Sequence, residues 1–125
     1  MDTKVFLDYL AKMQYLTLEA ENNNAVHHNI LDEIEKFLSR EELSLEEKAF
    51  FTGEQAFFSN QYNKALKSYS QARTVPYFPF FCHRAATQIY SKTGKKDQAI
   101  DYAKKALAAY PTDYITLSTL QNLLK

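Results

Sequence analysis

Histidine and cysteine, side chains often used in catalysis and metal binding, are scarce in this chain. Histidine occurs as the His27–His28 pair and as His83, and cysteine only as Cys82. Cys82 and His83 are neighbours in a segment with helical periodicity, where adjacent side chains point about 100° apart, so they do not form a nucleophile–base pair. No spacing of Cys, His and Asp suits zinc, and two glycines cannot form a glycine-rich phosphate loop. We predict a protein that is not an enzyme and holds no metal and no cofactor.

A group of lysines is the next feature to consider, because basic clusters can bind nucleic acids. The group consists of Lys92, Lys95, Lys96, Lys104 and Lys105. A nucleic-acid-binding domain usually has a pI above about 9 and clustered arginines, whereas this chain has a pI of about 6.8 and only three arginines. We expect these lysines to form a solvated outer face, and we expect no nucleic-acid partner.

The composition of the 125 residues is typical of one globular helical domain. Hydrophobic residues make up 46% and charged residues 24%, with only two glycines and three prolines, too few turn-forming residues for an all-β fold. No apolar run reaches the roughly 20 residues that span a bilayer. The N-terminal segment MDTKVFLDYLAK carries charges and no signal-cleavage pattern. Together with the single cysteine, these features predict a cytoplasmic protein with no membrane span.

Charge is divided unequally along the chain. Residues 1–58 carry 12 acidic and 5 basic side chains, a balance of −7, and residues 59–125 carry 3 acidic and 10 basic side chains, a balance of +7. Such opposed halves could favour head-to-tail self-association or steer a polar partner. The alternative is that each half simply has its own solvated face.

Hydrophobic periodicity is helical along nearly the whole chain. Apolar residues recur every three or four positions in residues 5–16 and again in residues 26–38, as on one face of an amphipathic helix. The sequence SLEE, which begins at Ser44, is a capping box, in which Ser44 and Glu47 bond each other's backbone amides. It predicts a helix from about Leu45 to Phe58.

The second half of the chain contains an internal repeat. Residues 60–72, NQYNKALKSYSQA, align with residues 94–106, GKKDQAIDYAKKA, at an offset of 34. Alanine pairs occupy matched positions, and the turn residue Asn60 matches Gly94; the alanine pairs are Ala65 with Ala99 and Ala72 with Ala106. Small residues at a fixed period of 34 indicate helical hairpins whose two helices approach closely.

On these residues the chain resembles the tetratricopeptide-repeat family, with one repeat at about 46–79 and a second at about 80–113. The family's small residue late in the first helix is Gly53 in the first repeat but Thr87 in the second, and its large residue three places later is Tyr90 in the second repeat but Ala56 in the first. The aromatic residue that opens the second helix is Tyr62 in the first repeat but Lys96 in the second. The closing proline is Pro111 in the second repeat, and in the first repeat Pro76 lies one place early. The resemblance implies an all-α, right-handed superhelical stack of antiparallel hairpins. Residues 1–43 would form a degenerate N-terminal hairpin, and residues 114–125 a capping helix.

The family resemblance also implies a concave binding surface on the first helix of each repeat. The corresponding residues are Glu47, Phe50, Glu54 and Phe57 in the first repeat and Phe81, Arg84, Gln88 and Ser91 in the second. Three phenylalanines with a few polar groups would suit an extended apolar segment or one face of an amphipathic helix. In the alternative interpretation, the N-terminal hairpin folds in and buries these rings.

These expectations favour a non-catalytic protein-interaction module. Some members of the family bind the C-terminal carboxylate of heat-shock chaperones through a Lys and an Asn. We do not expect this binding here, because those positions hold Phe50 and Glu54. In size and architecture the chain resembles the small chaperones of type III secretion needle or translocator subunits, which cover an apolar helix of their partner. The alternative function is an assembly or scaffold subunit, with a homo-oligomer possible through the opposed charged halves. A third is an adaptor repeat from a larger protein.

Overall fold

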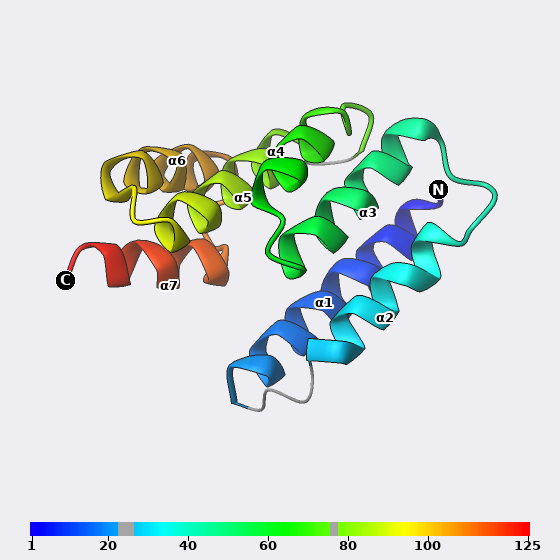
Figure 1. Ribbon diagram of the computed structural model, residues 1–125, viewed down its shortest axis with the longest axis horizontal. Helices are drawn as coiled ribbons and strands as arrows, with labels where there is room; N and C mark the ends of the chain where they lie inside the picture. Colours follow the sequence, from blue (N-terminus) through cyan, green and yellow to red (C-terminus); the bar gives the residue numbers. More distant parts are fainter. Residues whose placement is uncertain (23–26, 76–77) are drawn as a thin grey trace.

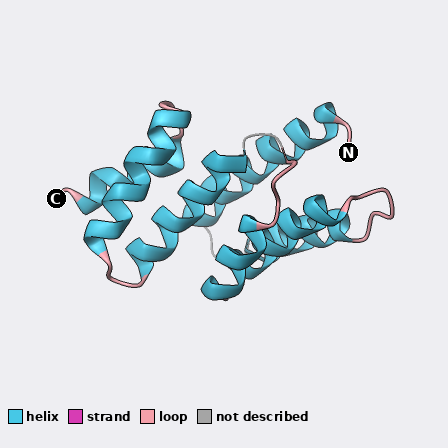
Figure 2. Cartoon of the chain, turned by 90° about the horizontal axis from the view of Figure 1, so that it is seen from above, coloured by secondary structure: helices cyan, strands magenta, loops and turns pink. Residues whose placement is uncertain are grey.

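The chain is all-helical where the computed structural model describes it, in residues 1–22, 27–75 and 78–125. These residues contain seven helices and no strand, which confirms the predicted all-α class (Figure 2). The helices are α1 (Thr3–Asn22), α2 (His27–Leu38), α3 (Leu45–Phe58), α4 (Tyr62–Ser70), α5 (Phe78–Lys92), α6 (Lys96–Ala109) and α7 (Tyr114–Leu123). Pro76, the proline expected near the end of the first repeat, lies outside the described residues.

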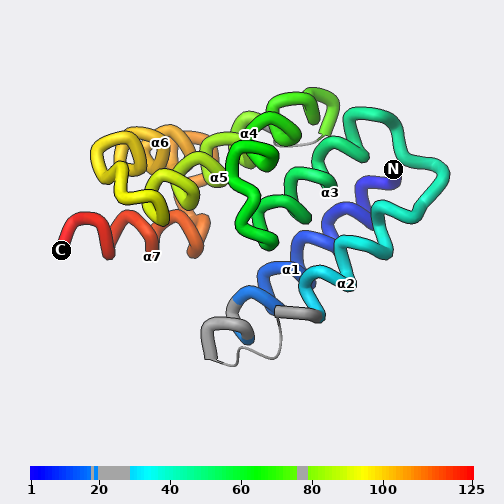
Figure 3. Tube along the Cα trace, viewed as in Figure 1, coloured from blue at the N-terminus to red at the C-terminus, as the bar shows by residue number. Residues whose placement is uncertain are grey.

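Consecutive helices pack against each other along the chain. Each helix contacts the next one in sequence, and α7 also returns to contact α5. The two termini therefore lie far apart along the longest axis, with α1 and α2 at one end and α6 and α7 at the other (Figures 1 and 3). Such neighbour-to-neighbour packing builds an elongated molecule rather than a closed bundle.

The start of α3 is fixed by the capping box predicted from the sequence. The Glu47 backbone N–H donates to the Ser44 hydroxyl at 3.1 Å, and the Ser44 N–H donates to the Glu47 carboxylate at 3.0 Å. Glu46 and Glu47 also place negative charge in the first turn, where the helix dipole favours it. The helix covers Leu45–Phe58, as the sequence predicted.

The turns that end α3 and α5 are structural copies at the 34-residue offset. Asn60 and Gly94 both have left-handed backbones, with φ values of 63° and 78°. After Asn60 the Gln61 N–H donates to the Ala56 carbonyl at 2.8 Å, and after Gly94 the Lys95 N–H donates to the Tyr90 carbonyl at 2.9 Å. Both turns are Schellman motifs, which satisfy carbonyls at the helix C-terminus. The repeat in the sequence is thus also a repeat in backbone geometry.

Close packing inside both hairpins depends on small residues. Ala65, Ala99 and Ala106 are fully buried. A Cβ added to Gly53 of α3 would lie 3.1 Å from the Tyr69 ring of α4, so glycine leaves room for that ring. Thirty-four residues later the order of sizes is reversed: Thr87 and Ala103 occupy the equivalent positions, and both are fully buried.

We expect the substitution Ala99→Leu to destabilise the α5–α6 hairpin. Ala99 has no exposed surface, so the larger side chain would overpack the contact and cost about 1–3 kcal/mol. Ala108→Leu is the matched control, because Ala108 lies on the same helix but is exposed. Chemical denaturation measures both variants, and equal stability of Ala99→Leu and wild-type protein would contradict the close-contact assignment.

Aromatic rings join the N-terminal hairpin to α3. Tyr9 of α1 lies 4.8 Å from the ring of Phe37 in α2 and 4.9 Å from that of Phe51 in α3, between ring centroids. Phe37 and Phe51 also stack on each other at 5.0 Å. On the hairpin itself, Lys12 of α1 forms an ion pair of 2.9 Å with Glu33 of α2. These contacts fix α1 beside α3, so that α1 can cover side chains of α3.

Candidate partner-binding groove

One groove of about 670 Å³ runs along the molecule and is lined mainly by alternate helices. Helix α1 forms one wall and α7 the other, while α3 and α5 form the floor. The lining side chains include Leu10 and Gln14 from α1, Glu54 and Phe57 from α3, Phe81, Arg84, Gln88 and Lys92 from α5, and Ile115 and Thr119 from α7. Its volume lies within the ordinary range of ligand and peptide clefts.

Phe50 lies beneath α1 and does not line the groove. Its ring is 1% exposed and packs edge-on against Phe6 of α1 at 5.5 Å and Phe81 of α5 at 5.0 Å. Phe6 also covers one side of Phe81 at 6.0 Å. For Phe50, the structure therefore matches the alternative interpretation, in which the N-terminal hairpin buries the ring. Phe81 is 5% exposed and still contributes to the groove floor.

Glu54 forms a buried polar junction between three helices. Its carboxylate accepts hydrogen bonds from the hydroxyls of Tyr9 in α1, at 3.2 Å, and of Tyr69 in α4. Burial raises the pKa of Glu54 above its ordinary value, although the Arg84 charge and the two tyrosine hydrogen bonds lower it. The same burial, with the nearby Glu54 charge, raises the pKa values of Tyr9 and Tyr69 well above their ordinary value. Both oxygens of Glu54 are thus occupied within the chain.

Arg84 lies on an aromatic floor and reaches toward α7. Its guanidinium carbon lies 5.2 Å from the Phe80 centroid and 5.3 Å from the Phe81 centroid, within cation–π range. Its Nη1 lies 3.4 Å from the carboxylate of Asp113, the N-cap of α7. Asp113 in turn accepts from the Thr116 backbone N–H at 3.0 Å and from the Thr116 hydroxyl at 2.6 Å. This chain of contacts positions α7 as the second wall.

Phe57 and Gln88 occupy the more open part of the floor. Phe57 is half-buried, and its ring lies 5.1 Å from Phe58 and 5.9 Å from the Lys92 ammonium nitrogen. Gln88 donates from Nε2 to the Thr119 hydroxyl of α7 at 2.6 Å. A bound segment could therefore contact the Phe57 ring without displacing any helix.

The structure brings five of the eight predicted groove residues to the cavity and leaves three outside. The five are Glu54, Phe57, Phe81, Arg84 and Gln88. Among the others, Phe50 is in the core, and Glu47 caps α3 and pairs with the N-terminal ammonium group at 2.9 Å. Ser91 is partly buried and does not line the groove.

Most of the lining residues that sequence reasoning missed fall into two sets. The first is the α1 and α7 walls, which fall outside the two repeats expected from the sequence. The second is Lys92 together with Phe58, which are equivalent at the 34-residue offset and lie one position beyond the last expected groove residue. The signal that could have identified Phe58 and Lys92 is that they occupy matched positions, 34 residues apart.

No family model, curated protein or solved structure matches this chain.

Cys82 and His83 each pack against other parts of the chain. The Cys82 thiol lies 3.6 Å from the Tyr69 carbonyl, and burial raises its pKa. His83 packs against the Tyr102 ring at 6.0 Å, and its pKa is lowered by partial burial and by Lys105.

Within the described residues, no group of three or more His, Cys, Asp or Glu is arranged to hold a metal ion. Among the described helices, none combines the length and apolar character that crossing a bilayer requires.

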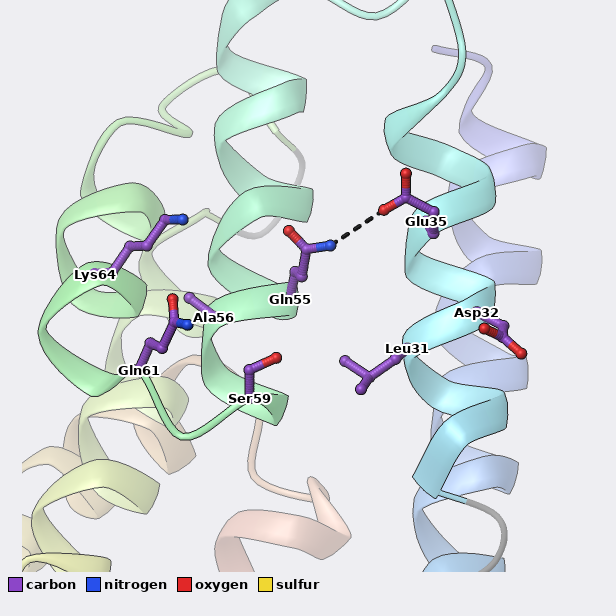
Figure 4. Close-up of a pocket in the computed structure, with 8 residues that line it drawn as sticks. All are labelled: Leu31, Asp32, Glu35, Gln55, Ala56, Ser59, Gln61 and Lys64. Atoms are coloured by element: carbon purple, nitrogen blue, oxygen red, sulfur yellow. Dashed lines mark hydrogen bonds between the residues drawn. The ribbon is translucent and has the colours of Figure 1, made fainter.

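A second, smaller cavity of about 350 Å³ separates α2 from α3 and α4 (Figure 4). Its lining is mostly polar: Leu31, Asp32, Glu35, Gln55, Ala56, Ser59, Gln61 and Lys64. The Gln55 amide donates to the Glu35 carboxylate across it at 3.1 Å. It lacks the aromatic floor of the groove and therefore offers little apolar surface to a partner.

Proposed function

We propose that this chain is a non-catalytic protein-interaction module whose groove holds a helix or an extended segment of a partner protein. The observation that carries the proposal is the groove itself, with an aromatic floor and a half-buried ring, Phe57, available for contact. Aromatic anchors in partly desolvated pockets commonly dominate the energy of protein–protein binding. The polar groups at Arg84 and Gln88 would fix the register of the bound segment.

We also propose a tetratricopeptide-like architecture, which would give the chain a groove of this kind. The copied turns at Asn60 and Gly94 and the buried alanines fit two repeats, at 46–79 and 80–113. The first helices of these repeats are α3 and α5, and in a superhelical stack α1 and α7 would occupy the same layer. That all four line one groove is what such a stack requires. Residues 1–43 would then be the divergent N-terminal hairpin and residues 114–125 the capping helix.

Covering an apolar segment of one partner in the cytoplasm is the role we propose for the groove. A small chaperone of a secretion-apparatus subunit, such as a type III needle or translocator subunit, would act in this way. Its partner's apolar helix would be shielded in the groove until assembly, which suits the half-buried floor at Phe57.

Site-specific photo-crosslinking in the source organism tests the groove directly. A photoreactive residue replaces Gln88 in the groove, and a matched variant carries it at Lys104, which is exposed on α6 away from the groove. We expect one protein to be captured from position 88 and not from position 104. Equal capture at both positions, or none at either, would contradict the proposal.

The opposed charges of the two halves favour a second candidate, an assembly or scaffold subunit that self-associates. If the −7 and +7 halves drive a head-to-tail contact, light scattering should show an oligomer at low salt. That oligomer should dissociate as salt rises, because the screening length falls from about 10 Å at 0.1 M to about 3 Å at 1 M. A monomer at both salt concentrations would leave groove binding as the function.

A further inference from the structure

The charged groups around the groove are not equally available to a partner. Two carboxylates, Glu54 and Asp113, and two cations, Arg84 and Lys92, line it. Which of these groups can bind a partner directly depends on which of them already have partners inside the chain.

Both carboxylates are satisfied internally. Glu54 is only 5% exposed and accepts hydrogen bonds from two tyrosine hydroxyls. Asp113 is 9% exposed and accepts from Thr116 through two bonds, besides its contact with Arg84. A carboxylate with its lone pairs occupied and little exposed surface offers little to an incoming cation.

Both cations retain unused capacity. Lys92 forms no ion pair with any carboxylate in the described part of the chain, and its ammonium group faces the Phe57 ring. Arg84 has five N–H donors, and in the described residues it uses one of them, toward Asp113 at 3.4 Å. The unused hydrogen-bond donors that the groove offers to a partner therefore belong to its two cations, Arg84 and Lys92.

The two cations lie on one stripe of α5. Arg84, Gln88 and Lys92 follow each other at intervals of four residues, so they share one face of the helix. Eight residues at a rise of about 1.5 Å separate Arg84 from Lys92 by roughly 12 Å along the axis. Residues at i and i+7 of a second helix are roughly 10.5 Å apart and also share a face.

We propose that the groove selects an apolar helix carrying two acidic side chains about two turns apart, one for Arg84 and one for Lys92. The apolar face of that helix would lie mainly on the half-buried Phe57 ring, between the α1 and α7 walls. This inference rests on the proposed function, because it names the chemistry of the groove's partner. Lysine and arginine at these two positions would thus determine partner choice, while the rings supply most of the affinity.

The test uses three synthetic helical peptides of about 18 residues, roughly five turns. All have the same apolar face and capped ends, so that only side chains carry charge. They differ at positions i and i+7, which are both Glu, both Gln or both Lys. Fluorescence anisotropy at low salt should show the Glu peptide binding about 5–30-fold more tightly than the Gln peptide, and the Lys peptide more weakly than both. The preference should shrink toward 1 M salt.

Charge-neutral variants identify the groups responsible. Lys92→Gln and Arg84→Gln should each reduce the preference for the Glu peptide, while Lys104→Gln on the exposed face of α6 should leave it unchanged. Lys92 is exposed and forms no ion pair with the described residues, so its variant keeps the fold even if the loss of Arg84 disturbs α7. A preference that survives in Lys92→Gln and Arg84→Gln, or that is equally lost in Lys104→Gln, overturns the assignment.

The peptides also separate this inference from the proposed function. Equal binding of all three peptides, or preference for the Lys peptide, would overturn the acidic partner while leaving the groove as a binding site. Binding of none would overturn the inference and would also contradict the proposal that the groove holds a helix. A dimer of the free protein that any of the peptides dissociates equally would assign the groove to a second copy and also overturn the inference.

Discussion

Phe50→Ala is expected to destabilise the protein by about 3–5 kcal/mol, enough to lower its melting temperature strongly. The Phe50 ring is 1% exposed and sits at the centre of an aromatic cluster with Phe6, Phe51, Tyr69 and Phe81, at centroid distances of 5.0 to 5.9 Å. Truncation would leave a cavity among four rings from four different helices. Such neighbours cannot all move inward, so most of the lost packing is not recovered.

Phe57→Ala is the matched variant, because Phe57 lies on the same helix two turns later. Its half-buried ring borders the groove, so its loss should cost much less stability than the loss of Phe50. Binding should respond in the opposite way. We expect Phe57→Ala to weaken binding of the captured partner, or of the acidic peptide, by roughly 30-fold or more.

Denaturation and binding measured on both variants decide between the two roles. If Phe57→Ala unfolds the protein as severely as Phe50→Ala, Phe57 belongs to the core and the groove is not a binding surface. If Phe50→Ala retains wild-type stability, α1 does not cover that ring in solution. The groove would then extend to Phe50, as the sequence-based expectation had it.

The parts of the fold that depend on local chemistry were predictable from the sequence. Ser44 and Glu47 specify the start of α3, because a capping box needs only two residues that lie three positions apart. The end of α3 follows the same logic: a residue that tolerates a left-handed backbone, Asn60, recurs as Gly94 one repeat later. The close-contact role of buried alanines such as Ala65 and Ala99 could be predicted because they recur at an offset of 34 residues.

The site was only partly predictable, because a position in a repeat indicates which face a side chain occupies but not what covers that face. Phe50 and Phe57 occupy equivalent faces of α3, yet only Phe50 lies beneath Phe6 of α1. The α1–α2 hairpin departs from the repeat pattern, because Leu31 and Leu38 lie one 34-residue period before the small residues Ala65 and Ala72. Its position depends on tertiary packing, chiefly of Tyr9 with α2 and α3, which no local pattern encodes.

Above pH 10 the protein should lose stability steeply. Tyr9 and Tyr69 have pKa values well above the ordinary value, mainly through burial and secondly through the charge of Glu54. In the unfolded chain both tyrosines release their protons near pH 10, whereas the folded chain retains them. The unfolded state then binds fewer protons, so the free energy of unfolding falls as pH rises. The expected slope is about 1.4 kcal/mol per pH unit for each tyrosine, present above pH 10 and absent below it.

Denaturant titrations between pH 9 and pH 12 measure this slope, and single variants separate the contributions. Tyr9→Phe should remove about half of the tyrosine-dependent slope. It should also lower stability at neutral pH by about 1–3 kcal/mol, because the buried Glu54 carboxylate loses a donor. Tyr114→Phe is the control, since Tyr114 is 49% exposed and takes no part in the Glu54 junction. If Tyr9→Phe and Tyr114→Phe show the same slope as wild-type protein, the Tyr9 hydroxyl is not buried against the Glu54 carboxylate in solution. The junction that holds α1 over the groove floor would then have to be formed by the aromatic contacts alone.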